Sequence, residues 1–68
     1  MYLKVPTLSN RKATIAEVEK AIQEIAPRSG LTVDAGLNYP CVEFPASVSH
    51  SEYERVRAAL IERGFVAY

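Results

Sequence analysis

The sequence predicts a small α+β domain in which strands and helices follow the order β-α-β-β-α-β. Three observations support this prediction. Residues 31–45 alternate apolar and polar side chains with the period of two that a half-buried β-strand requires. Residues 14–26 and 49–63 instead place apolar side chains at the spacing of an amphipathic helix. Short apolar stretches at 2–6 and 65–68 add a first and a last strand.

The stretch 31–45 is predicted to form a β-hairpin at the centre of the fold. In its first strand, the residues expected to face the core are Leu31, Val33, Ala35 and Leu37. In its second strand, Val42 and Phe44 face the core. The turn falls at residues 38–40, because asparagine tolerates left-handed backbone and proline fixes φ and has no amide hydrogen. Two strands alone are marginally stable in water, so the rest of the chain must cover their apolar face.

Both predicted helices carry N-terminal capping signals. The Thr14–Glu17 segment has the capping-box pattern, in which a hydroxyl and a carboxylate satisfy helix amides reciprocally. The buried stripe of this helix is expected to contain Ile15, Val18, Ile22 and Ile25. Two overlapping boxes precede the second helix, starting at Ser49 or at Ser51, and the sequence does not choose between them. The buried stripe of the second helix is expected to contain Tyr53, Val56, Ala59 and Leu60. Gly64 should end it in left-handed conformation.

Residues 7–13, between the first strand and the first helix, are expected to be a polar loop. Across nearly the whole chain, the element order resembles the ferredoxin-like fold. This resemblance implies one four-stranded antiparallel-type sheet with both helices on one face. Right-handed crossovers would put strands 2–5 and 41–44 in the centre, and strands 31–37 and 65–68 at the edges. The fold carries many unrelated functions, so it does not indicate one.

Composition restricts the class of protein. The chain has 68 residues, which make one domain spanning 1–68. Eight basic and eight acidic residues balance, so overall charge does not predict attraction to nucleic acid or to a membrane. A single cysteine, Cys41, and a start without a leader-like segment indicate a cytoplasmic protein. We find no motif for a catalytic, metal or cofactor site, and therefore expect no enzyme, no metal and no cofactor.

The loop before the first helix is the first candidate site. Asn10, Arg11 and Lys12 lie where helix amides and the positive end of the helix dipole favour an anion. In position, the loop is similar to the phosphate cradle of acylphosphatases, which share the ferredoxin-like fold, and this similarity implies a small hydrolase. The loop lacks the glycines that let backbone amides wrap around an anion. A solvated basic loop is the alternative interpretation.

The face of the sheet that points away from the helices is the second candidate site. Its predicted residues include Tyr2, Lys4 and Glu43, in the position where RNA-recognition domains of the same topology stack bases on aromatic side chains. One aromatic side chain beside carboxylates is a poor platform for nucleotides. Cys41 is expected to be a half-buried strand residue, and His50 an exposed residue near a helix cap.

The final strand is the third candidate site. Val66 and Tyr68 lie on an expected sheet edge that has no lysine or proline to block pairing, so a second copy or a partner strand could add there. We therefore expect a non-enzymatic protein-binding domain that occupies a partner's surface. In size and apparent lack of catalytic machinery it resembles inhibitors and adaptors encoded by phages and mobile elements, including some anti-CRISPR proteins. The alternative is a nucleic-acid-binding module that uses the 9–12 loop and the open sheet face.

Overall fold

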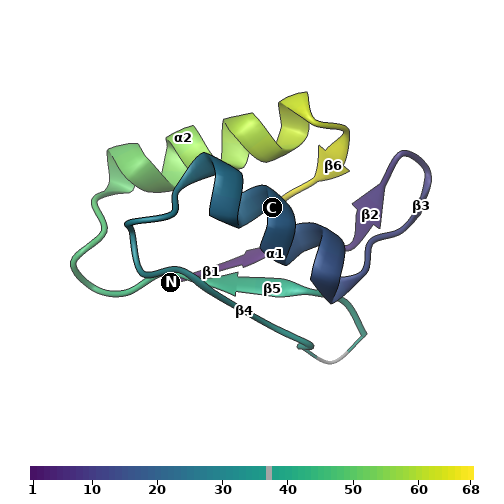
Figure 1. Ribbon diagram of the computed structural model, residues 1–68, viewed down its shortest axis with the longest axis horizontal. Coiled ribbons are helices and arrows are strands. Elements are labelled where there is room, and N and C mark those ends of the chain that lie inside the picture. The colour runs from purple at the N-terminus through teal and green to yellow at the C-terminus, as the bar shows by residue number, and fades with distance from the viewer. Residues whose placement is uncertain (37) are drawn as a thin grey trace.

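The computed structural model describes residues 1–36 and 38–68, and it has a mixed α+β architecture (Figure 1). The described residues form two helices and six short strands, which are β1 (Tyr2–Lys4), β2 (Thr7–Leu8), β3 (Arg11–Lys12), α1 (Ile15–Ile25), β4 (Thr32–Asp34), β5 (Cys41–Glu43), α2 (His50–Glu62) and β6 (Phe65–Val66). The predicted order of strands and helices is present, with one additional hairpin between the first strand and the first helix.

The strands form two three-stranded antiparallel sheets, with orders β1-β5-β4 and β3-β2-β6, so the predicted single four-stranded sheet is wrong. The physical reason lies at Pro6, which separates β1 from β2 and has no amide hydrogen for a ladder bond. Beyond this break, β2 pairs with β3 and β6 instead of extending the first sheet. Two backbone hydrogen bonds between Lys4 and Tyr68, of 2.7 and 2.9 Å, still join the end of the chain to β1.

Segment 7–13, predicted to be a loop, contains the additional hairpin. Leu8 of β2 lies opposite Arg11 of β3, which leaves Ser9 and Asn10 as a two-residue turn. Both turn residues have positive φ, 50° and 68° respectively, as a tight hairpin with a type I′ turn requires. Asparagine adopts this backbone more readily than most residues, so its presence was a usable signal for a turn.

The predicted central hairpin is confirmed between β4 and β5, but its first strand is shorter than the predicted range 31–37. β4 ends at Asp34, whose Oδ1 accepts a hydrogen bond of 3.0 Å from the amide of Gly36. Gly36 has a φ of 55°, and a Cβ at this position would lie 2.6 Å from the carbonyl oxygen of Tyr39. The chain therefore turns away from the sheet several residues earlier than the alternating pattern suggested.

Most side chains of the hairpin take the predicted faces. The inward positions that the structure confirms are Val42, Phe44, Leu31 and Val33, of which the first two are fully or nearly fully buried. Ala35 is exposed, because β4 has already ended. The predicted inward position of Leu37 lies outside the described residues.

The two helices begin at the predicted kinds of cap. The Thr14 hydroxyl accepts a hydrogen bond from the Glu17 amide (3.2 Å), and Glu17 Oε1 accepts one from the Thr14 amide (2.9 Å), which confirms the capping box. Of the two candidates before α2, the structure selects Ser49, whose Oγ accepts from the Glu52 amide at 3.2 Å. Gly64, with a φ of 96°, follows the end of α2 as predicted.

One hydrophobic core joins both sheets to both helices. α1 packs on β4, α2 packs on β6, and the two helices contact each other (Figure 1). The buried residues of this core are Leu3, Val5, Ala13, Val18, Ala21, Ile22, Ala26, Val42, Phe44, Val56, Leu60, Phe65 and Ala67. Ile15 was predicted to face the core, but at the first turn of α1 it is 36% exposed. No polar or charged side chain is buried within the described part of the chain.

Truncation of Phe44 tests the core. Its ring meets the Tyr53 ring edge-on, with centroids 5.1 Å apart, and is almost fully buried. We expect Phe44→Ala to lower the free energy of unfolding by about 3–5 kcal/mol, because it leaves a large cavity. Such a loss removes most of the stability of a domain of this size. Urea denaturation followed by circular dichroism measures it, with the exposed Tyr2→Ala as control. If the two variants unfold at the same urea concentration, Phe44 is not a core residue.

Candidate functional site

The first candidate surface is the face of sheet β1-β5-β4 that the helices leave uncovered. In the pairing of β1 with β5, Tyr2 lies opposite Glu43, and Lys4 lies opposite Cys41. Because Tyr68 exchanges two backbone hydrogen bonds with Lys4, its side chain stands beside Lys4 on the same face. The Lys4 Nζ lies 5.5 Å from the centre of the Tyr68 ring, in a cation–π contact. Tyr2, Lys4 and Glu43 therefore share one surface with Tyr68, which was predicted to belong to the separate edge-strand site.

We call this surface the open face and define it by Tyr2, Lys4, Glu43, Val66 and Tyr68. Val66 belongs to it because Phe65 and Ala67 point into the core, so the residues that alternate with them point outward. Tyr2 and Tyr68 are each 60% exposed, and Val66 is 47% exposed. The negative charge of Glu43 raises the pKa of the Tyr2 hydroxyl.

Cys41 lies half-buried in the middle strand of this sheet, as predicted. Burial and then the charge of Asp34 raise the pKa of the Cys41 thiol, while Lys4 opposes them weakly. The thiol therefore stays protonated, and a protonated thiol is a poor nucleophile and a poor metal ligand. Within the described residues, no three His, Cys, Asp or Glu side chains form a group that could hold a metal ion.

The edge of β6 is partly covered. In an antiparallel pair, residues whose backbone groups face the neighbouring strand alternate with residues whose groups face away. Tyr68 is bonded to Lys4, so the backbone groups of Ala67 face away from the sheet. The Ala67 carbonyl accepts a hydrogen bond of 3.1 Å from Nε of Arg57 in α2. This side chain covers part of the edge where strand pairing through Val66 and Tyr68 was predicted, and that pairing stays a prediction.

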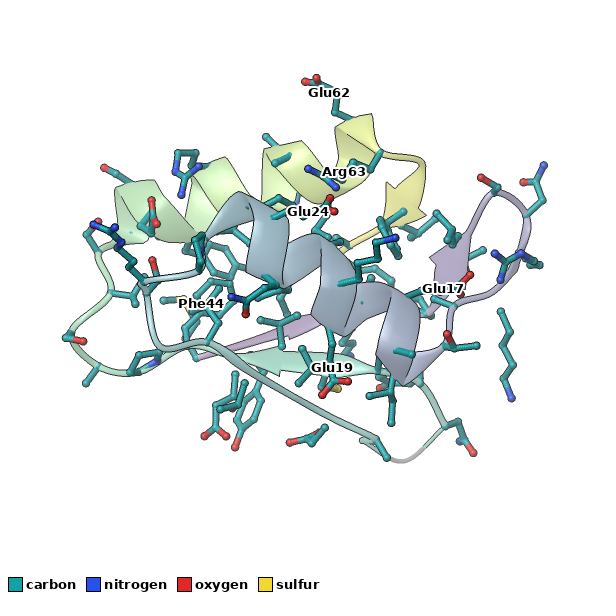
Figure 2. The ribbon with its side chains drawn as sticks, in the orientation of Figure 1. Glu17, Glu19, Glu24, Phe44, Glu62 and Arg63 are labelled. Carbon is teal, nitrogen blue, oxygen red and sulfur yellow. The ribbon has the colours of Figure 1, made fainter. Side chains whose placement is uncertain are left out.

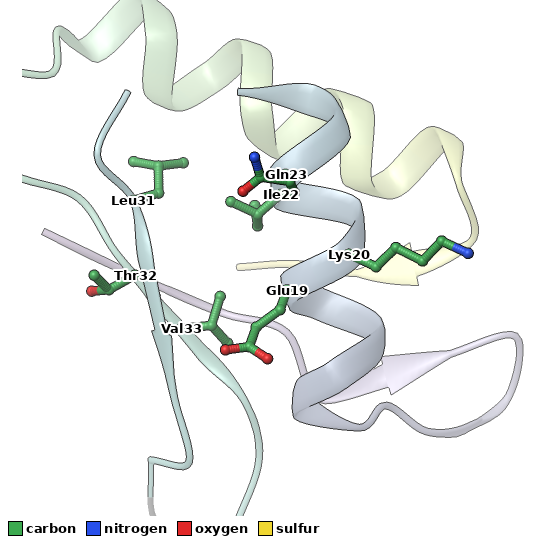
Figure 3. A pocket seen from close by; sticks show the side chains of 7 residues that line it. All are labelled: Glu19, Lys20, Ile22, Gln23, Leu31, Thr32 and Val33. Atoms are coloured by element: carbon green, nitrogen blue, oxygen red, sulfur yellow. The ribbon is translucent and has the colours of Figure 1, made fainter. Parts of the chain in front are cut away.

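The second surface is a groove of about 600 Å³ between α1 and β4 (Figure 3). Ile22 of α1 and Val33 of β4 provide apolar lining, and Glu19 provides a carboxylate. In Figure 3, the Glu19 side chain reaches toward Val33, while the Lys20 side chain extends away from β4. This groove was not among the sites predicted from the sequence. The available signal was the predicted edge strand 31–37, which contains no lysine or proline, next in the chain to an amphipathic helix.

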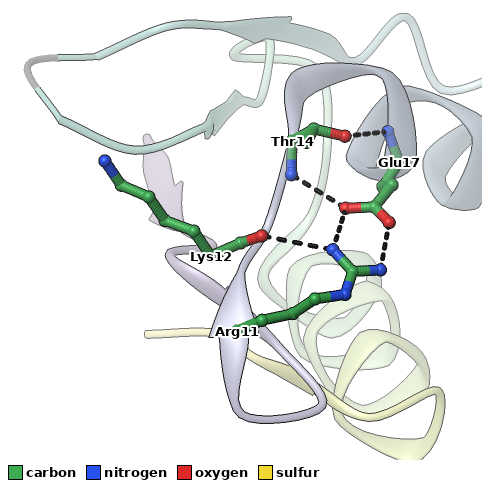
Figure 4. A network of polar contacts seen from close by, with 4 residues as sticks. All are labelled: Arg11, Lys12, Thr14 and Glu17. Atoms are coloured by element: carbon green, nitrogen blue, oxygen red, sulfur yellow. Dashed lines mark hydrogen bonds and ion pairs between the residues drawn. The ribbon is translucent and has the colours of Figure 1, made fainter.

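The third surface is the predicted anion site before α1 (Figure 4). The Arg11 guanidinium binds both carboxylate oxygens of Glu17, with Nη1 donating to Oε1 at 3.0 Å. The Arg11 hydrogen bonds first, and the Thr14 amide second, lower the pKa of the Glu17 carboxyl to about 2. The protein's own carboxylate therefore lies where an external anion was predicted. An anion site at Asn10, Arg11 and Lys12 stays a prediction, and it would have to compete with Glu17.

Further ion pairs involve residues of α1 and α2. Arg55 donates to both oxygens of Glu52 at 2.7 and 2.8 Å, and the Ser29 hydroxyl donates to the same carboxylate at 2.9 Å. The Arg55 hydrogen bonds first, and Ser29 second, lower the pKa of the Glu52 carboxyl to about 2. Arg63, the C-cap residue of α2, pairs with Glu24 of α1, and Figure 2 shows these two side chains facing each other.

His50 is exposed at the first residue of α2, as predicted. Its ring stacks on the Tyr53 ring with centroids 5.9 Å apart, and its Nε2 lies 3.6 Å from a carboxylate oxygen of Glu54. These contacts hold the imidazole against the surface of the helix.

Neither helix in the described part of the chain combines the length and the apolar character needed to cross a membrane. Comparisons of the chain with protein-family models, with curated proteins and with solved structures find no match. Function must therefore be argued from the three surfaces themselves.

Acid titration tests the carboxylates Glu17 and Glu52. Each has a pKa of about 2 in the folded protein, against an ordinary value of 4.5. Because folding lowers these pKa values, each carboxylate stabilises the fold fully above pH 4.5 and loses this effect as the pH falls toward 2. Glu17→Gln and Glu52→Gln should therefore melt below wild type at pH 7, and the difference should shrink toward pH 2.

Thermal melts between pH 7 and pH 2 measure this convergence. Glu62→Gln is the matched control, because its carboxylate extends into solvent away from both helices (Figure 2). It should melt close to wild type at pH 7. A constant difference between wild type and Glu17→Gln at every pH would contradict the ion pair.

Proposed function

We propose that this chain is a non-enzymatic protein-binding domain that acts in the cytoplasm, as an inhibitor or adaptor, by occupying a partner's surface. The observation that most supports the proposal is the pair of tyrosines, each 60% exposed, that flank Lys4 on the open face. Tyrosine is enriched among the residues that dominate binding energy at protein interfaces. Its ring supplies a large contact area at a low cost in conformational entropy.

The chemistry of the open face describes the expected partner. Tyr2, Tyr68 and Val66 favour an apolar patch on the partner, which would cover side chains that water now surrounds. Lys4 and Glu43 carry opposite charges on the same face, so they favour a partner with charges in the complementary order. β1 is hydrogen-bonded to β5 on one side and to Tyr68 on the other. Because these bonds hold the open face in one arrangement, the face needs little reorganisation to bind a partner.

Nucleic-acid binding is the second candidate function. In its favour, Tyr68 adds a second aromatic side chain beside Tyr2, and exposed aromatic rings stack bases. Against it, Glu43 and Asp34 lie on the same side of the sheet, and Arg11 of the basic loop is paired with Glu17. Phosphate neutralisation dominates nucleic-acid affinity, so this arrangement favours a protein partner. The same Arg11 pair weakens the support for an acylphosphatase-like hydrolase.

The double substitution Tyr2→Ser and Tyr68→Ser tests the proposal. We expect it to weaken capture of a specific partner by at least about tenfold, because each tyrosine is a candidate for a dominant contact. Affinity capture from cells that express the protein, read by mass spectrometry, compares wild type with the variant. Ile61→Ser, at an exposed apolar side chain of α2, is the matched control and should retain the partner.

Circular dichroism confirms that the double variant is folded, and fluorescence anisotropy with a 20-nucleotide single-stranded RNA at low salt tests the second candidate. RNA binding that disappears in the double variant would replace the protein-binding proposal. A partner retained equally by wild type and by the double variant would show that the open face is not the contact.

A further inference from the structure

We infer that the edge of β4 beside α1 takes up an extended, basic segment of a partner protein, which adds to sheet β1-β5-β4 as a fourth strand. This inference agrees with the proposed function in naming a protein as the partner. It concerns a different surface from the open face, so either surface can fail its test without the other.

The backbone groups of successive β5 residues point alternately toward β1 and toward β4. The Phe44 amide donates to the Met1 carbonyl (2.9 Å), and the Val5 amide donates to the Pro40 carbonyl (3.0 Å). In antiparallel strands, residues that bond to a given neighbour alternate with residues that do not. Val42, which lies between Phe44 and Pro40 in this alternation, therefore directs its backbone groups toward β1.

The same alternation of backbone direction continues into β4. Since Val42 faces β1, its neighbours Cys41 and Glu43 direct their backbone groups toward β4. They lie opposite Asp34 and Thr32, which bond to them. Val33, between these two, consequently directs its N–H and C=O away from the sheet. β4 is the last strand in its sheet among the described residues, so these groups form an open edge.

A groove lies beside this edge of β4. The groove of about 600 Å³ between α1 and β4 is lined by Leu31, Val33 and Ile22 (Figure 3). A strand added to β4 would direct every second side chain into the groove, against this apolar lining. Its remaining side chains would lie on the other side of the sheet, beyond Thr32 and Asp34. Strand addition beside a groove is a recurrent mode of peptide recognition, in which backbone bonds give affinity and the groove gives specificity.

Three carboxylates lie around this edge of the sheet. Glu19 lines the groove, while Asp34 and Glu43 lie on the opposite side of the sheet. None of the ion pairs among the described residues includes any of these three carboxylates. Lys20, the other charged residue of the groove, extends away from β4 (Figure 3). Basic side chains of an added strand would therefore meet, on both sides of the sheet, a carboxylate that is in none of these ion pairs.

The same charges disfavour a second copy of the chain as the occupant. Pairing two β4 edges across a two-fold axis would bring Glu19 and Asp34 close to the same residues of the other copy. Like charges facing each other across paired strands are destabilising. A basic segment of another protein avoids this repulsion, so it is the occupant that the edge favours.

The test uses a synthetic hexapeptide, acetylated and amidated, of sequence Lys-Lys-Val-Val-Lys-Lys, so that each side of the extended peptide carries one valine and two lysines. Titration into ¹⁵N-labelled protein should shift the amide signals of Leu31 and Val33 and slow hydrogen exchange at the Val33 amide. The same peptide with glutamate in place of lysine should bind at least about tenfold more weakly, because it meets only like charges. A peptide N-methylated at every residue, so that neither of its edges can donate to Val33, should not bind.

Two variants locate the site. Val33→Pro removes the outward N–H without removing a ladder bond to β5, and it should abolish peptide binding. Glu19→Lys reverses an exposed charge on α1, and it should weaken binding at least about fivefold while leaving the fold intact. Lys20→Gln, one residue away and directed elsewhere, is the matched control and should bind as wild type does. If Val33→Pro does not fold, the N-methylated peptide and Glu19→Lys decide the question.

Four results would overturn the inference. One is equal binding of the lysine and glutamate peptides. Another is equal binding of the N-methylated and the unmodified peptide. The third is signal shifts at Tyr2 and Tyr68 with none at Val33, which would move the peptide to the open face. Sedimentation that shows a concentration-dependent dimer, weakened by Glu19→Lys or Val33→Pro, would replace the partner segment with a second copy.

Discussion

Burial of the first strand holds the rest of the structure together. Leu3 of β1 and Val5, which follows β1, are completely buried in the core that both helices share. On one side β1 pairs with β5, and on the other Lys4 exchanges two backbone hydrogen bonds with Tyr68. A chain of 68 residues buries a modest share of its surface in a single core. A segment that is buried in this core and hydrogen-bonded on both sides therefore carries a large part of the stability.

The core is apolar, so the charges are arranged entirely at the surface. Arg11 and Arg55 are held by carboxylates at helix N-terminal turns, where each exposed pair stabilises the fold only slightly. Their main consequence is that these guanidinium groups are not available to an external anion. By contrast, Glu19 and Asp34 near β4 are in no ion pair of the described residues. The net charge of the chain is zero, but carboxylates that take part in none of these ion pairs gather near the β4 edge of the sheet.

The open face and the β4 edge belong to the same sheet. Tyr68, Lys4, Cys41 and Asp34 lie side by side across successive strands, from the C-terminal end of the chain to the edge. A strand added beyond β4 would extend the open face by one more row of side chains. One partner protein could therefore contact both surfaces, with an extended segment on the edge and a folded surface against the tyrosines.

The sequence by itself determined the α+β class, the extents of both helices and most inward-facing positions. These depend on local physics: a periodic apolar pattern, a capping box at Thr14–Glu17, and a residue free to adopt positive φ at Gly64. Only the tertiary structure decided which strands pair. The break at Pro6 and the tight hairpin after it create a second sheet, whose bonds join residues far apart in the chain. For the same reason, no local sequence pattern contains the placement of Tyr2 and Tyr68 on one face. The groove beside β4 is likewise absent from any local pattern. Both arise from contacts between distant segments, which burial in a shared core selects.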